Sequence, residues 1–64
     1  MEKFKAGYMK KYWFIEIENG SATVQEDINS FSLKHISRFI LGNMFPSLEA
    51  ANISLKANYS RLAN

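Results

Sequence analysis

Hydrophobic and polar residues alternate along two short runs, residues 12–18 and 21–28, that meet at Asn19–Gly20. Such alternation is typical of strands that bury one face. An Asn-Gly pair between two such runs indicates a two-residue hairpin, because both turn positions of a type I′ turn have positive φ. The sequence therefore predicts an antiparallel hairpin in which Glu18 lies opposite Ser21.

This register sorts the side chains onto two faces, because directly opposed residues share one side of a sheet. One face is apolar apart from a single carboxylate and contains Trp13, Ile15, Ile17, Ala22, Val24, Glu26 and Ile28. The other face is mostly polar and contains Tyr12, Phe14, Glu16, Glu18, Ser21, Thr23, Gln25 and Asp27. We expect the apolar face to form the core and the second face to lie toward solvent.

Apolar residues after the hairpin recur at helical spacing, at Leu33, Ile36, Phe39, Ile40 and Met44. The spacing predicts a helix over about residues 33–44, with these side chains packed on the apolar face of the hairpin. Ser30 or Ser32 would supply the N-cap, and Pro46 cannot continue the helix. The polar helix positions, which we expect to lie toward solvent, are Lys34, His35, Ser37 and Arg38.

Residues 48–64 fit two patterns. Ile53, Leu55, Ala57 and Tyr59 alternate with polar residues as in a strand, whereas Leu48, Ala51, Leu55, Tyr59 and Leu62 form a helical stripe with Ser47 as cap. A hairpin and one helix need a third strand for a sheet of independent stability. We therefore favour a strand over about residues 53–59, and an α+β fold of ββαβ order in which a small antiparallel sheet carries one helix on its apolar face.

Size and composition indicate one small domain over residues 1–64, with residues 1–11 as a flexible basic arm. The chain has 64 residues, no cysteine and a net charge of +2. So small a core usually needs a disulfide, a metal or a partner subunit, and the missing cysteines favour self-association in a reducing compartment. No apolar run approaches a membrane span and no signal peptide precedes the hairpin, so we expect a cytoplasmic protein.

The sequence offers little for catalysis. His35 is the only histidine, and the three glycines are isolated rather than gathered into a phosphate-binding loop. The acidic residues of the hairpin would lie on an open face, where no cleft shifts their pKa values, and their spacing matches no calcium loop. We expect a protein that is not an enzyme and has no cofactor, metal or catalytic residue.

Two large rings on the predicted solvent face are the best candidates for a binding site. Aromatic side chains surrounded by polar groups are typical of protein interfaces, and an open sheet edge favours pairing with another chain. The predicted partner-binding residues are Tyr12, Phe14, Glu16, Glu18 and Asp27, in a protein that binds a partner protein or itself, as a homodimer. In an alternative interpretation, a second layer such as a C-terminal helix covers both rings within the monomer.

Nucleic-acid binding is a second hypothesis, because basic residues and aromatic rings on a sheet are typical of single-strand binders. The basic candidates for this function are Lys10, Lys11, Lys34 and Arg38. Four acidic residues and no Lys or Arg lie within residues 12–32, which would repel a phosphate backbone.

The order strand, Asn-Gly, strand, capped helix, proline and strand resembles the small ββαβ proteins of phages and mobile elements. Many members of that group bind and block a host or defence protein stoichiometrically. The resemblance is one of architecture and implies no site residues. It implies a binding inhibitor or regulator rather than an enzyme.

Overall fold

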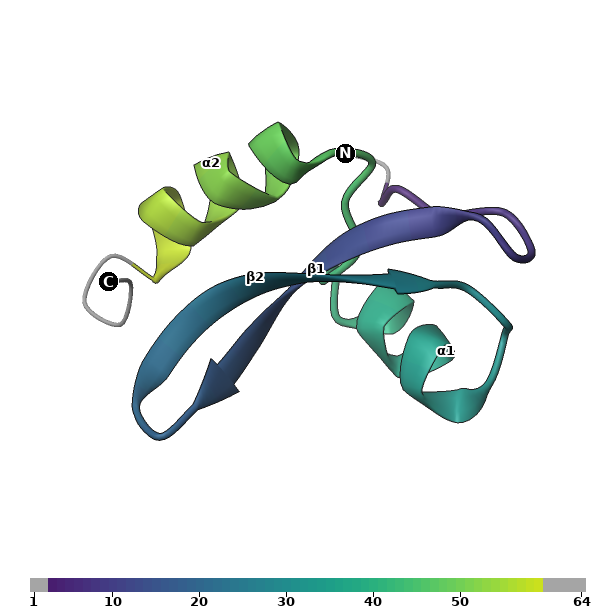
Figure 1. Ribbon diagram of the computed structural model, residues 1–64, viewed down its shortest axis with the longest axis horizontal. Coiled ribbons are helices and arrows are strands. Elements are labelled where there is room, and N and C mark those ends of the chain that lie inside the picture. The colour runs from purple at the N-terminus through teal and green to yellow at the C-terminus, as the bar shows by residue number, and fades with distance from the viewer. Residues whose placement is uncertain (1–2, 60–64) are drawn as a thin grey trace.

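The computed structural model describes residues 3–59 and folds as an α+β protein of ββαα order (Figure 1). Its elements are β1 (Lys11–Glu18), β2 (Ser21–Ile28), α1 (Leu33–Ile40) and α2 (Leu48–Asn58). The two strands form one antiparallel sheet, and the helices lie on opposite sides of it. The α+β class is confirmed, whereas the third strand is not.

The hairpin has the predicted turn and register. Glu18 pairs with Ser21 and Ile15 with Val24, and the remaining pairs follow from this alignment. Asn19 and Gly20 have φ values of 53° and 80°, so both turn positions occupy the left-handed region that a type I′ turn requires. The sorting of side chains onto two faces is therefore also as predicted.

The outer edge of β1 is covered by the segment that follows α1. The Trp13 N–H donates to the Phe45 carbonyl at 3.0 Å, and the Phe45 N–H donates to the Trp13 carbonyl at 2.8 Å. The Asn43 side chain continues this pairing, because its Oδ1 accepts from the Ile15 N–H at 2.7 Å and its Nδ2 donates to the Ile15 carbonyl at 2.8 Å. One bridge and one side-chain amide thus take the place of a third strand at this edge.

The predicted strand over residues 53–59 is wrong, because these residues belong to α2 or directly follow it. The helix is started by Ser47, whose Oγ accepts from the Ala50 N–H at 3.0 Å. Glu49 in the first turn and Lys56 in the last complement the helix dipole. Leu62 of the alternative helical stripe lies outside the described residues.

Helix α1 ends four residues earlier than predicted. Gly42 has a φ of 74°, its N–H donates to the Phe39 carbonyl, and the Asn43 N–H donates to the Arg38 carbonyl at 2.7 Å. This pair of bonds is a Schellman motif, which ends the helix at Ile40. Ser32 occupies the predicted N-cap position, but its side chain makes no capping bond.

Each face of the sheet carries one helix, and both faces are partly buried. Helix α2 contacts both strands on the face predicted to be apolar, where Ile15, Ala22 and Ala51 are buried. On the opposite face, the buried cluster that adjoins Phe39 of α1 consists of Ala6, Tyr12, Phe14 and Met44. The expectation that Tyr12 and Phe14 face solvent is wrong, as is the expectation that α1 covers the apolar face.

The N-terminal segment lies against the start of the hairpin. The Met9 N–H donates to the Asn29 carbonyl, and the Asn29 N–H donates to the Lys10 carbonyl at 2.9 Å. Asn29 is buried, and its side chain donates from Nδ2 to the Ala6 carbonyl at 2.8 Å. Residues 3–10 of the predicted arm are therefore bonded to the rest of the molecule, and residues 1–2 lie outside the described residues.

Candidate interaction surface

A partly buried polar network joins α1 to the sheet. Tyr12 and Asp27 are directly opposed across the hairpin, and both side chains meet α1. Arg38 donates from one guanidinium nitrogen to the Tyr12 hydroxyl at 2.7 Å and to Asp27 Oδ2 at 2.9 Å. The Tyr12 hydroxyl lies 2.5 Å from His35 Nδ1, and the Arg38 guanidinium stacks on the Phe14 ring, 3.6 Å from its centroid.

The surroundings of His35 favour its neutral form. The Tyr12 hydroxyl accepts from Arg38, and we assign its own proton to the bond with His35 Nδ1, because burial and nearby positive charge disfavour a protonated ring. Burial is the main cause that lowers the pKa of His35, with the charges of Arg38 and Lys34 acting in the same direction and Asp27 opposing them. His35 is therefore a neutral acceptor, which the sequence-based expectation of a solvent-facing histidine misses.

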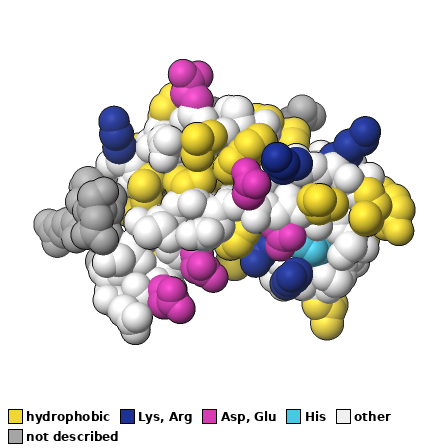
Figure 2. All heavy atoms as spheres, viewed as in Figure 1, with side chains coloured by type: hydrophobic (Ala, Val, Ile, Leu, Met, Phe, Trp, Pro, Cys, Tyr) yellow, Lys and Arg dark blue, Asp and Glu magenta, His cyan; other side chains and the backbone are white. Residues whose placement is uncertain are grey.

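The acidic and basic members of the network stabilise each other. Burial alone would raise the pKa of Asp27, but hydrogen bonds from Arg38 and the Ile28 N–H, together with nearby positive charge, lower it below its usual value. Burial alone would lower the pKa of Arg38, but its bonds to Tyr12 and Asp27 raise it. Figure 2 shows acidic and basic side chains beside the histidine on this side of the molecule.

The network sets the rotation of α1, and this rotation is opposite to the predicted one. His35 and Arg38 point toward the sheet, so most of the apolar stripe points away from it. Leu33 is 81% exposed and Ile40 is 60% exposed, whereas of the predicted stripe only Phe39 and Met44 contribute to the buried cluster. We call the exposed residues of this helix and its C-cap the α1 surface; they are Leu33, Ile36, Ile40 and Leu41.

Further apolar side chains adjoin the α1 surface. The Tyr8 ring lies 5.7 Å from that of Phe31, centroid to centroid, and Lys5 Nζ lies within 6 Å of the centroids of both Phe31 and Phe39. Of the twelve large hydrophobic residues exposed in the described part of the chain, eight lie in the N-terminal segment or between Phe31 and Leu41. The exposed apolar area is thus concentrated in one region.

The same region carries positive charge. Lys3 donates to the Ile40 carbonyl at the end of α1, and Lys34 lies at its start. No acidic residue occurs among residues 3–10 or 28–48. The nearest carboxylate along the chain, Asp27, is already paired with Arg38 and Lys34. The α1 surface is therefore an apolar stripe surrounded by lysines.

The predicted partner-binding residues separate into two groups. Tyr12 and Phe14 are buried, with Tyr12 0% exposed, so neither ring can contact a partner unless α1 moves. Asp27 is held by the network. Glu16 and Glu18 are exposed at the tip of the hairpin, as predicted.

Three of the four basic residues predicted for nucleic-acid binding are paired with carboxylates. Lys11 lies 3.8 Å from Glu26, and Lys34 lies 3.7 Å from Asp27. Arg38 makes the short bonds of the network. Lys10 is exposed and has no ion pair among residues 3–59.

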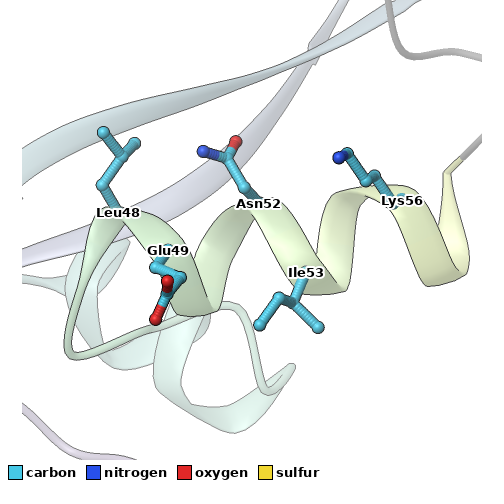
Figure 3. A pocket seen from close by; sticks show the side chains of 5 residues that line it. All are labelled: Leu48, Glu49, Asn52, Ile53 and Lys56. Carbon is cyan, nitrogen blue, oxygen red and sulfur yellow. The ribbon is translucent and has the colours of Figure 1, made fainter.

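The part of the chain that the structure describes has several shallow hollows. One hollow next to His35 has a volume of about 30 Å³, close to the share of one water molecule. Another hollow follows α2 alone, where Leu48, Asn52 and Lys56 point to one side of the helix and Glu49 and Ile53 to another (Figure 3). Within residues 3–59 no cluster of His, Asp or Glu could hold a metal ion. Neither helix in this part of the chain is long and apolar enough to cross a membrane.

Sequence reasoning assigned Leu33, Ile36 and Ile40 of the α1 surface to the core, although one signal favoured the observed rotation. In the predicted register Tyr12 lies opposite Asp27, at the open end of the hairpin, and both need polar partners once they are covered. His35 and Arg38, three residues apart, lie on one side of a helix and can supply them.

The fold and surface define a class: a small α+β protein with a two-stranded sheet, one helix on each face, and an apolar stripe turned outward. Comparison with protein-family models, with curated proteins and with solved structures finds no match for this chain.

Proposed function

We propose that this chain is a small non-enzymatic interaction module that binds a partner protein through the α1 surface. The observation that carries the proposal is the rotation of α1, which turns polar side chains to the sheet and Leu33, Ile36 and Ile40 outward. Residues at positions i, i+3 and i+7 form one stripe, the spacing by which a helix docks into an apolar groove. Exposed apolar area of this kind usually marks an interface.

The charge around the stripe supports a partner of defined chemistry. Lys3, Lys5 and Lys34 adjoin it, and the surrounding segments carry no carboxylate. We infer a partner protein with an apolar groove and acidic residues at its rim. Such a complex should form faster at low salt than at high salt, because charges at a rim steer association.

The narrower form of the proposal is an inhibitor or regulator of the phage type, which blocks its target by stoichiometric binding. The small size and the outward stripe support it. The observed ββαα order departs from the ββαβ order on which that resemblance was based.

Paired surface variants test the proposal. The chain carrying Leu33→Ser and Ile40→Ser is compared with a matched control that carries Leu48→Ser and Ile53→Ser on α2, where both residues are also exposed. A protein that co-purifies with the wild-type chain is isolated, and the mass of the complex is measured by native mass spectrometry. The contacting residues are mapped by changes in their amide chemical shifts. We expect a 1:1 complex that maps to α1, survives in the control and is lost in the α1 variant.

Two results would contradict the proposal: a complex that tolerates the α1 variant, or a wild-type chain that binds no protein. Adding an oligonucleotide in place of the protein tests the nucleic-acid hypothesis, for which Lys10 is the unpaired basic candidate. Affinity for the oligonucleotide that falls steeply with salt and survives the α1 variant would favour that hypothesis instead.

A further inference from the structure

The two edges of the sheet differ, and the edge of β2 is open. Trp13 and Ile15 direct their backbone groups away from β2, since both bond to the segment after α1. In an antiparallel pair the opposed residue then also directs its groups outward, so Val24, opposite Ile15, faces away from β1. Backbone groups alternate in direction along a strand, so Ala22 and Glu26, two residues to either side of Val24, also direct their N–H and C=O groups away from β1.

No group within residues 3–59 bonds to these backbone N–H and C=O groups. The open stretch is short because both of its ends are closed. The Asn19–Gly20 turn lies at one end, and at the other the Ile28 N–H donates to Asp27 Oδ1 at 2.7 Å. Unpaired strand groups favour pairing with another strand.

We propose that β2 pairs with β2 of a second copy, antiparallel about a twofold axis at Val24, to give a four-stranded sheet. The open stretch is centred on Val24, so this is the register in which all three outward residues find partners. Val24 then lies opposite itself, and Ala22 lies opposite Glu26 of the other copy. A sheet of more than two strands also has the independent stability that a lone hairpin lacks.

Side-chain chemistry fits this register. Thr23 lies opposite Gln25 of the second copy, a pair that can form a hydrogen bond, and Glu26 faces a small neutral residue. Like charges, which would destabilise the pairing, are not opposed anywhere between residues 22 and 26.

Charge along the hairpin also favours the antiparallel arrangement. The tip carries Glu16 and Glu18 and no Lys or Arg. The opposite end carries Lys10, Lys11, Lys34 and Arg38 against Glu26 and Asp27, which leaves it net positive. Antiparallel pairing brings the acidic tip of each copy next to this net positive end of the other. The pairing uses a different part of the molecule from the α1 surface, so it is independent of the proposed function.

The first test is the mass of the wild-type chain in solution, by sedimentation equilibrium. We expect a dimer that dissociates on dilution. Val24→Pro removes only the outward N–H, which an edge strand tolerates, and should give a folded monomer by circular dichroism. A wild type that stays monomeric at millimolar concentration would overturn the proposal, as would a dimer that persists in folded Val24→Pro.

Cysteine cross-linking tests the register without depending on the proline variant, because the wild type has no cysteine. Hydrogen-bonded residues in antiparallel strands have Cα atoms about 5.5 Å apart, which suits a disulfide. Val24→Cys should therefore oxidise rapidly to a covalent dimer. Gln25→Cys, about 8 Å from its symmetry mate, and Ile17→Cys on β1 should oxidise slowly. Equal rates for the three variants would exclude the proposed register.

Discussion

The Tyr12 hydroxyl determines how α1 lies on the sheet. It accepts from Arg38 and is hydrogen-bonded to His35 Nδ1, so both of its partners are residues of the helix. Each such bond contributes about 1 kcal/mol, and a buried group left unpaired costs about 1–3 kcal/mol. Rotating α1 to bury Leu33 and Ile40 would expose these partners and leave the hydroxyl unpaired. The cost of breaking the network thus offsets the gain from burying two more apolar side chains.

Neutral His35 makes folding stability depend on pH. Its folded-state pKa is lowered from the usual value of 6.5, so the unfolded chain binds a proton that the folded protein does not. The stability is present in full above pH 6.5 and is lost as the pH falls from there to the folded-state pKa. The slope cannot exceed about 1.4 kcal/mol per pH unit, because one proton is involved. Urea denaturation at a series of pH values measures it.

The matched control for this prediction is His35→Asn, whose side-chain oxygen can accept from the Tyr12 hydroxyl but does not titrate. The free energy of unfolding of this variant should not change with pH in the same window. It should fall only in more acidic solution, where Asp27 becomes protonated. The pKa of Asp27 is lowered from 3.8, so its contribution is present above that pH and is lost as the pH falls through the folded-state value. An identical slope near pH 6 in both proteins would show that His35 is not the titrating group.

Asn43 should be more important to stability than its partial exposure indicates. Asn43→Ala removes two bonds to Ile15 and should lower the free energy of unfolding by about 1–3 kcal/mol. Asn43→Asp should lower the free energy of unfolding at least as much at neutral pH, because a carboxylate can accept from the Ile15 N–H but cannot donate to the Ile15 carbonyl. Asn52→Ala, on the exposed side of α2, is the control. A loss of equal size in the control would contradict this account.

Individual side chains were predictable where the chemistry is local. Asn19 and Gly20 determine the turn, and the turn determines every pair of the hairpin, so the register followed from the sequence. The burial of Tyr12 and Phe14 did not follow, because alternation reveals two faces but not whether the second face is covered. The contact between Asn43 and Ile15 joins residues far apart in the sequence, and no spacing pattern encodes it.

At the scale of elements, local signals fix where a helix begins or ends better than its periodicity does. The apolar repeat of α1 continues to Met44, yet the Schellman motif at Gly42 ends the helix at Ile40. In α2 the Ser47 cap gives the helix a start that a strand would lack. The two patterns in residues 48–59 fit equally well on periodicity alone. The edge of β1 is already occupied by Phe45 and Asn43, which leaves a third strand no place there.

Gly42→Ala should destabilise the end of α1 through backbone conformation alone. The residue has a φ of 74°, and an added Cβ would meet no atom within 4 Å, so no steric clash contributes. The left-handed conformation should cost about 1–2 kcal/mol for alanine. Gly7→Ala is the control, since its φ is not in that region and its added Cβ would make an ordinary contact. Thermal unfolding measures both variants, and equal losses would contradict the assignment.

At the scale of the whole molecule, the two helices are attached by different chemistry. Helix α2 covers the face with Ile15 and Ala22, where burial of apolar area stabilises packing. Helix α1 is attached largely by the polar network and by the cluster around Tyr12 and Phe14. The outer side of α1 therefore contributes little to attaching the helix, and its apolar residues are available for binding.

This separation predicts that the outer side of α1 can be made polar at little cost. Leu33 and Leu41 are about 80% exposed. Leu33→Ser with Leu41→Ser should change the free energy of unfolding by no more than about 0.5 kcal/mol, as is usual for surface positions. Binding of a hydrophobic dye should fall more than it does for Leu48→Ser with Ile53→Ser, because these two lie outside the concentrated apolar region. If the α1 pair instead lost more stability than the α2 pair, the outer residues of α1 would belong to the core, and the polar network would not be what attaches the helix.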